Sequence, residues 1–173
     1  MRYLSKEEIE LNYQHAKNTP SDINEHLPKL REYAEQCDHI TELGVRGVVS
    51  TWAFLASKAS KVVAVDILNV IVPNCEKLTF ICADDLTIEI DETDFLFIDT
   101  AHNYKQCIAE LNLHGNKARK FIGFHDTFIF GANGDDGAKG LNAAIDEFLL
   151  NNSHWSLDYD TTINNGLTIL KRV

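Results

Sequence analysis

Short apolar runs alternate with stretches of helical periodicity over most of the chain. Five of these runs are nearly continuous, and they cover residues 40–43, 62–67, 79–83, 94–98 and 121–124. Continuous apolar strands are typical of a parallel sheet that is covered on both faces, because neither face then contacts water. Helical spacing over residues 50–58 and 104–113 predicts crossover helices between the strands. The pattern therefore predicts an α/β fold.

The last part of the chain predicts one more helix and an antiparallel edge. Residues 141–150 have helical spacing, and strands are expected at 155–160 and 166–171. Only five residues, 161–165, join these strands, so a hairpin is expected. The glycine-rich segment 131–140 is not expected to hold one conformation easily. We therefore predict a doubly wound, seven-stranded, mostly parallel, Rossmann-like sheet with an antiparallel C-terminal edge hairpin.

The N-terminal residues predict helices in front of this sheet. Residues 1–18 are charged and helical in pattern. A second helix is expected after Thr19, which can cap it, and Pro20, which suits a first turn. Pro28 is expected to weaken or kink this helix. Its apolar residues recur at helical spacing, namely Ile23, Leu27, Leu30, Ala34 and Cys37.

Length, charge and cysteine placement narrow the classes of function. A chain of 173 residues is one domain by length and can bury a sizeable core. Its net charge of −10, with no Lys/Arg cluster, disfavours nucleic acid as a partner. No apolar run has the length of a membrane span or signal-peptide core, so no membrane partner is expected. Four cysteines without C-x-x-C spacing favour buried free thiols and a reducing, cytoplasmic location; these are Cys37, Cys75, Cys82 and Cys107.

Acidic and imidazole side chains follow the predicted strands at the edge where an open α/β sheet binds ligands. Polar residues commonly end strands, so chance can supply two or three of them. An acid after each of five strands favours a binding site. The residues are Glu42, Asp66, Asp84 with Asp85, Asp99 with His102, and His125 with Asp126.

The turn after the first predicted strand is the most specific motif. Residues 41–51 predict a strand, a glycine turn and a helix, and residues 62–66 predict a second strand that ends in Asp66. Gly44 and Gly47 allow a ligand to approach backbone N–H groups at a helix start. Asp66 can accept hydrogen bonds from both hydroxyls of a ribose. The spacing lacks the G-x-G-x-x-G fingerprint, which disfavours a nicotinamide-dependent dehydrogenase.

These motifs together resemble class I S-adenosylmethionine-dependent methyltransferases, in the branch of small-molecule O-methyltransferases and cephalosporin-hydroxylase-like proteins. The resemblance rests on the acid-x-Gly-x-x-Gly turn, on D-x-x-H-x-Y at residues 99–104 and on H-D-T at residues 125–127, and it covers roughly residues 23–150. It implies methyl transfer from S-adenosylmethionine to an oxygen, less readily a nitrogen, of a small-molecule or sugar-like acceptor. Residues 1–173 would form a single domain, in which residues 1–38 form helices that cover the cofactor site and residues 39–173 form the Rossmann-like core.

The resemblance also implies the cofactor contacts. Asp66 would bind the ribose, and Asp84 or Asp85 would lie beside the adenine. Val48 departs from the pattern, because relatives often have another glycine at this position. The methionine end of the cofactor would be lined by Glu42, Gly44, Gly47 and Ser50.

A divalent metal ion is a further implication that the sequence leaves open. Some members of this branch hold magnesium through acids that correspond to Asp99 and Asp126. His125 stands where those members usually have a second carboxylate, so magnesium or manganese would lose a charged oxygen ligand. A histidine and carboxylate set suits a transition metal better. Asp135 or Asp136 could replace the missing oxygen, or could simply be solvated.

His102, with Asp99, is the predicted catalytic centre. The unperturbed pKa of histidine, about 6.5, lets His102 act as a general base near neutrality, and transfer to a hydroxyl requires removal of its proton. Spaced three residues after Asp99, it could lie on the first turn of the next helix and face the same cleft. The alternative is that His102 supports this helix while Asp99 binds backbone amides. Tyr104 could stack on a substrate or pack.

A second class of function also stays open, a non-catalytic protein of the same fold that binds S-adenosylmethionine. The short chain motivates it, because little sequence remains to shape an acceptor pocket. The sequence does not name the acceptor, and it is compatible with a homo-oligomer. Five further histidines lack ligand spacing and are expected at the surface or in packing; these are His15, His26, His39, His114 and His154.

Overall fold

The computed structural model describes residues 2–173, and these residues form a seven-stranded sheet with the order β3-β2-β1-β4-β5-β7-β6. Strands β1 to β5 pair in parallel, whereas β7 is antiparallel to both β5 and β6. The predicted mostly parallel sheet with an antiparallel C-terminal hairpin is confirmed. The strands are β1 (His39–Leu43), β2 (Lys61–Asp66), β3 (Leu78–Cys82), β4 (Thr93–Ile98), β5 (Ala118–His125), β6 (Trp155–Thr161) and β7 (Leu167–Arg172).

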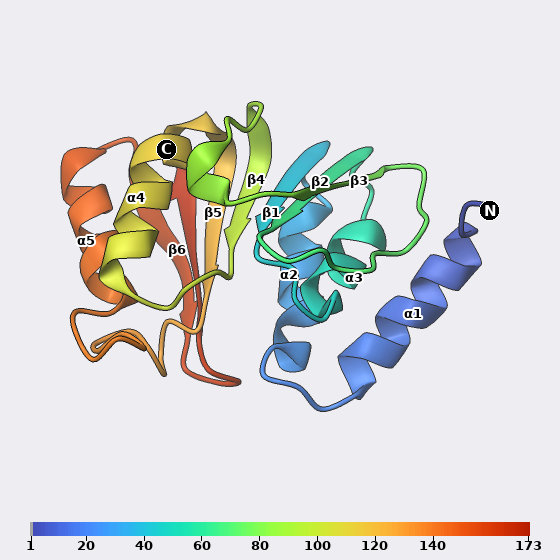
Figure 1. Cartoon of the computed structure of the whole chain (residues 1–173), viewed down its shortest axis with the longest axis horizontal. Coiled ribbons are helices and arrows are strands. Elements are labelled where there is room, and N and C mark those ends of the chain that lie inside the picture. Colours follow the sequence, from blue (N-terminus) through green and yellow to red (C-terminus); the bar gives the residue numbers. More distant parts are fainter. Residues whose placement is uncertain (1) are drawn as a thin grey trace.

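Helices cover both faces of the sheet (Figure 1). Because side chains alternate along a strand, Phe95 and Phe97 of β4 pack on one face while Leu96 and Ile98 pack on the other. No helix within residues 2–173 has both the length and the apolar character needed to cross a membrane. One face holds α1 (Lys6–Asn18), α2 (Leu27–Ala34) and α3 (Val49–Leu55), and the other holds α4 (Tyr104–His114) and α5 (Leu141–Asn151).

The second N-terminal helix begins later than predicted. Thr19 is the C-cap of α1 and does not cap the next helix. A short 3-10 helix, η1 (Asn24–His26), precedes α2, and Pro28 occupies the first turn of α2. Proline suits this position because the first amides of a helix need no intrahelical acceptor. Pro28 therefore starts the helix, and the expected kink is wrong.

Helices cover the centre of the sheet on both faces, but they cover less of its β3 edge. Residues 67–77, between β2 and β3, contain no helix, and the β3–β4 connection contains only the 3-10 helix η2 (Asp85–Thr87). Ile71 is 94% exposed as a result. Cys82 in β3 is exposed too, so the expectation of a buried thiol is wrong there, although Cys37, Cys75 and Cys107 are buried free thiols.

Candidate active site

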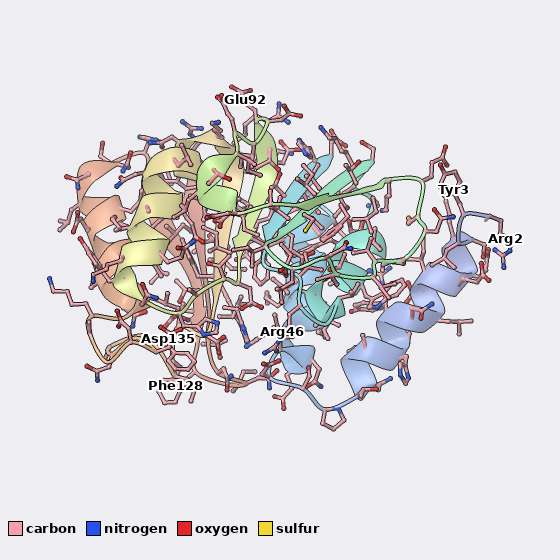
Figure 2. The ribbon with its side chains drawn as sticks, in the orientation of Figure 1. Arg2, Tyr3, Arg46, Glu92, Phe128 and Asp135 are labelled. Carbon is pink, nitrogen blue, oxygen red and sulfur yellow. The ribbon has the colours of Figure 1, made fainter. Side chains whose placement is uncertain are left out.

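The carboxyl ends of the parallel strands meet at one end of the molecule. Arg46, which follows β1, lies at this end together with Phe128 and Asp135, which follow β5 (Figure 2). Glu92, which precedes β4, lies at the opposite end. The guanidinium of Arg46 pairs with Asp22, so the segment before η1 reaches the glycine turn.

Left-handed backbone shapes the turn between β1 and α3. Gly44, Arg46 and Val48 have φ angles of 86°, 38° and 62°. A Cβ atom at Gly44 would lie 1.9 Å from the carbonyl oxygen of Asp99, so this position requires glycine for its conformation and for the close approach of β4. Val48 is strained, because β-branched residues rarely adopt a positive φ. At Gly47 the nearest atom to such a Cβ is 3.6 Å away, so packing does not require glycine there.

Asp66 holds this turn in place from the end of β2. Its Oδ2 atom accepts hydrogen bonds from the backbone N–H groups of Val45 (2.8 Å) and Arg46 (2.9 Å). Its Oδ1 atom accepts one bond, from the N–H of Leu68 at 2.8 Å. Burial opposes ionisation, but the three amides outweigh it and lower the pKa of Asp66. Asp66 is thus a carboxylate with a turn-shaping role that the sequence did not indicate, and Oδ1 retains capacity for a further donor.

Glu42 and Ser50 lie beneath the turn. Glu42 is fully buried and accepts hydrogen bonds from the hydroxyls of Ser50 and Thr51, the latter at 2.7 Å. Burial raises the pKa of Glu42 to about 8, although both hydroxyl bonds favour the ionised form. These residues tie β1 to α3, and their contact with a cofactor stays a prediction.

The two acids after β3 have different environments. Asp84 is exposed and caps η2, since its Oδ1 atom accepts from the N–H of Leu86 at 3.0 Å. Asp85 turns toward α4, where its Oδ1 atom accepts from Nε2 of Gln106 at 3.3 Å. Its carbonyl oxygen lies 2.9 Å from Nε2 of His114, which is buried, one of the two placements expected for this histidine. Asp84 is the acid of this pair that faces solvent.

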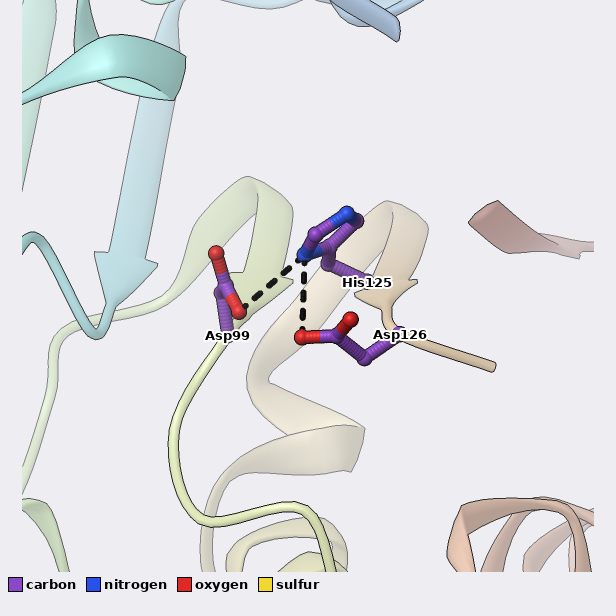
Figure 3. A group of neighbouring side chains, drawn as sticks. All are labelled: Asp99, His125 and Asp126. Atoms are coloured by element: carbon purple, nitrogen blue, oxygen red, sulfur yellow. Dashed lines mark hydrogen bonds and ion pairs between the residues drawn. The ribbon is translucent and has the colours of Figure 1, made fainter. Parts of the chain in front are cut away.

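Asp99, His102, His125 and Asp126 form one cluster, here called the catalytic cluster after the role predicted for His102 and Asp99, which stays a prediction. Nε2 of His102 lies 2.8 Å from Oδ2 of Asp126 and 3.7 Å from Oδ1 of Asp99. Nδ1 of His125 lies 3.2 Å and 3.4 Å from the same two oxygens (Figure 3). Asp99 and His125 come from the ends of β4 and β5, and Asp126 adopts a left-handed φ of 62° that aims its side chain back at them. The structure thus brings the predicted catalytic and metal residues together.

The pKa values of both histidines are raised in this cluster. Burial alone would lower them, but hydrogen bonds with Asp126 and Asp99 raise the pKa of His102 to about 9 and that of His125 to about 10. The same bonds hold the pKa of Asp126 well below its usual range, against the effect of burial. Two imidazolium ions therefore balance two carboxylates at neutral pH. The ordinary pKa of about 6.5 that the sequence suggested for His102 does not apply, because two carboxylates surround the ring.

The contacts of Nε2 of His125 show that Nδ1 is the ring nitrogen that can bind a metal. Nε2 lies 3.0 Å from the carbonyl oxygen of Asp22 and 3.3 Å from that of Asn164. Carbonyl oxygens only accept, so Nε2 carries a proton, and Nδ1 faces the carboxylates with either a proton or a metal ion. The ligand atoms of Asp99, His125 and Asp126 lie within 4.8 Å of one another. Moreover, Oδ1 of Asp126 is buried and has no hydrogen-bond partner in the described part of the chain. One imidazole and two carboxylates fit a divalent transition metal better than magnesium.

Comparisons of sequence and of structure give different results. No protein-family model matches the sequence, and no curated protein matches it. Solved structures match nearly the whole chain. A putative caffeoyl-CoA O-methyltransferase from Staphylococcus aureus has a TM-score of 0.67 at 15% identity, covering 95% of this chain and 92% of its own. The chain has the same Rossmann-like fold as this methyltransferase structure.

Two further structures show the same methyltransferase fold. Cofactor-bound Rv0187 from MTB has a TM-score of 0.64 at 16% identity, over 95% of this chain and 89% of its own. An O-methyltransferase from Bacillus cereus in complex with SAH has a TM-score of 0.59 at 17% identity, over 97% of this chain and 90% of its own. The fold implied by the sequence resemblance is confirmed.

Several residues around the catalytic cluster of this methyltransferase fold were not predicted. Phe130 stacks on His102, with ring centroids 4.8 Å apart and an angle of 7° between the planes. His26 lies edge-on to His125 at 5.7 Å. His26 reaches the cluster from a segment distant in sequence. Phe130 follows Asp126 by four residues, but its stacking partner His102 lies 28 residues away, so no local pattern marks this contact.

The glycine-rich segment 131–140 packs against the loop that carries His102. Asp135 accepts hydrogen bonds from the N–H of His102 and from Nδ2 of Asn103, both at 3.2 Å, and its own N–H donates to the carbonyl of His102 at 3.0 Å. Asp136 accepts from the N–H of Ala138. Asp135 therefore supports the backbone of His102. Tyr104 bonds Glu147 through its hydroxyl at 2.7 Å and so belongs to the contact between α4 and α5.

Proposed function

We propose that this protein transfers a methyl group from S-adenosylmethionine to an oxygen atom of a small-molecule acceptor. The observation that carries the proposal is the catalytic cluster, which lies beside the glycine turn because Gly44 packs directly on the backbone of Asp99. The Bacillus cereus O-methyltransferase of the same fold holds SAH, which supports S-adenosylmethionine as the cofactor here.

The turn and its neighbours would bind the cofactor. Gly44 and Gly47 would allow backbone approach at the start of α3, and Oδ1 of Asp66 would accept a ribose hydroxyl. Asp84 is the better candidate for the adenine side, because Asp85 is already bonded to α4. Glu42 and Ser50 lie beneath the turn. They would contribute indirectly, because the hydrogen bond between them fixes where α3 begins.

His102 would remove the acceptor proton. With Nε2 donating to Asp126, Nδ1 of the neutral ring takes up the proton while the acceptor oxygen attacks the methyl carbon and the carbon–sulfur bond breaks. Asp126 then stabilises the imidazolium. A divalent ion on Asp99, His125 and Asp126, when bound, would lower the pKa of the acceptor hydroxyl.

The net charge and the free cysteines indicate the partners and the cellular location of a protein with this function. The net charge of −10 supports a small-molecule acceptor and no nucleic-acid or membrane partner. Three buried free cysteines support a cytoplasmic location.

Isothermal titration of chelator-treated protein with S-adenosylhomocysteine, with and without manganese, tests the proposal. We expect micromolar binding by the parent, loss of binding in Asp66→Ala, and parental binding without turnover in His102→Ala. Asp91→Ala, at an exposed acid paired with Lys61, is the control. If the parent does not bind, or if both site variants bind like the parent, the site assignment is wrong. Binding without transfer to any member of an acceptor library would favour the non-catalytic alternative.

A further inference from the structure

A polar stripe on α4 holds the loops after β3 and β4 together. Gln106, Glu110 and His114 are spaced by four residues and so share one helix face. Gln106 and His114 bond the side chain and the carbonyl of Asp85. Glu110 Oε1 accepts from the Thr100 hydroxyl at 2.5 Å and from Nε2 of Gln106 at 2.9 Å.

Two oxygens in this stripe lack a partner. Oε2 of Glu110 and Oδ2 of Asp85 are both buried and have no hydrogen bond to any of residues 2–173. Glu110 is fully buried, and its carboxyl group lies beside that of Asp85, because Nε2 of Gln106 donates to Oε1 of Glu110 at 2.9 Å and to Oδ1 of Asp85 at 3.3 Å. Two adjacent carboxylates cannot both stay ionised in such a site. Burial, and then the bond with Asp85, raise the pKa of Glu110 well above its usual value. One proton on Glu110, donated to Asp85, would satisfy both oxygens.

We propose that Asp85 and Glu110 share one proton and form a positioning pair that joins the loop after β3 to the loop that carries Asp99. The pair acts on the cluster through Thr100, the residue after Asp99. Glu110, Asp99 and His125 line one cavity of about 10 Å³, room for one water molecule. In this proposal Glu110 acts through Thr100 and not through contact with the acceptor or the cofactor.

The functional value of this pair rests on the proposed function. There, the loop after β3 would lie beside the adenine and the loop after β4 would hold the catalytic residues. A rigid connection between them sets the distance from the bound cofactor to His102, and methyl transfer depends on such alignment.

A double-mutant cycle tests the shared proton without any ligand. Glu110→Gln keeps an acceptor for Thr100 and offers an amide N–H to Asp85. Asp85→Asn keeps an acceptor for Gln106 and offers an amide N–H to Glu110. In the double variant two amide donors face each other. We expect each single variant to keep the Tm within about 2 °C of the parent, and the double variant to lose at least about 5 °C more than their sum. If both carboxyl groups are ionised instead, each single substitution replaces a repulsion with a hydrogen bond, and each single variant would have a Tm more than about 2 °C above that of the parent.

Ligand binding tests the positioning role. In calorimetry with S-adenosylhomocysteine, we expect Glu110→Gln to bind like the parent and Glu110→Leu to bind about tenfold more weakly. Parental affinity in Glu110→Leu would overturn the positioning role. If the parent itself does not bind, the proposed function fails, whereas the double-mutant cycle still decides whether the proton is shared.

Discussion

Nε2 of His102 lies 2.8 Å from Oδ2 of Asp126, and three quarters of the His102 side chain is shielded from solvent. This bond makes the proposed base a stronger base than a free histidine, but it also keeps the ring protonated at neutral pH. The active form of the site is therefore the minor one near pH 7.

The pH dependence of methyl transfer follows from this bond. We expect kcat/KM to rise with pH through an apparent pKa near 9, because only neutral His102 can accept the acceptor proton. In Asp126→Asn the apparent pKa should fall by at least about one unit, since the imidazolium loses a carboxylate. Asparagine tolerates the φ of 62° at this position. Asp136→Asn, on the exposed loop, is the control, and an apparent pKa near 6.5 in the parent would contradict the assignment.

Stability should decrease in alkaline solution. His102 and His125 have folded-state pKa values of about 9 and 10, above the value of about 6.5 in an unfolded chain. Their stabilising effect is complete below pH 6.5 and is lost as pH rises through 9 to 10. We expect the free energy of unfolding to fall by on the order of 6 kcal/mol between pH 7 and pH 10 if the two histidines contribute independently. Urea unfolding measures this, and in His125→Gln the fall should be smaller. An equal fall in both proteins would contradict the prediction.

Gly44 and Gly137 have similar backbone conformations but different surroundings. Substitutions at these two positions therefore distinguish the cost of backbone strain from the cost of a steric clash. Gly44 and Gly137 have φ angles of 86° and 75°, but a Cβ at Gly137 would meet no atom within 4 Å. Gly137→Ala should therefore cost only about 1 kcal/mol. Gly44→Ala should cost more than about 3 kcal/mol and abolish binding of S-adenosylhomocysteine, because β4 must move away from the turn. Thermal unfolding of the two variants compares them, and equal costs would show that the turn and β4 are not in contact.

Metal binding should compete with a proton. A divalent ion on Nδ1 of His125 must displace the proton that Asp99 and Asp126 stabilise there. We expect manganese or zinc affinity to increase with pH up to about 10, and calorimetry in buffers of different ionisation enthalpy should detect proton release. His125→Gln should weaken binding at least tenfold, whereas His154→Gln, at a half-buried histidine bonded to Asn116, should not. Binding without proton release would place the ion elsewhere.

Much of the fold could be predicted from the sequence because strand and helix periods are local properties. The apolar pattern correctly predicts the strands that contain Ile40, Val62, Phe95 and Phe121 and the helix that begins at Tyr104. The start of α2 could not be predicted in this way. Thr19 and Pro20 have the chemistry of a helix start, and only the packing of Leu27 and Leu30 in the core decided that the helix begins later.

The apolar pattern was enough to predict which residues lie at the carboxyl edge of the sheet, because a parallel sheet places the ends of its strands together. Asp66, Asp99 and Asp126 follow directly from that rule. The contacts that these residues make there depend on tertiary packing. Asp66 binds the amides of its own turn, and His102 meets Asp126 from another strand. Hydrogen bonds and pKa values depend on distances between segments far apart in the chain, and those distances arise only when the core has packed.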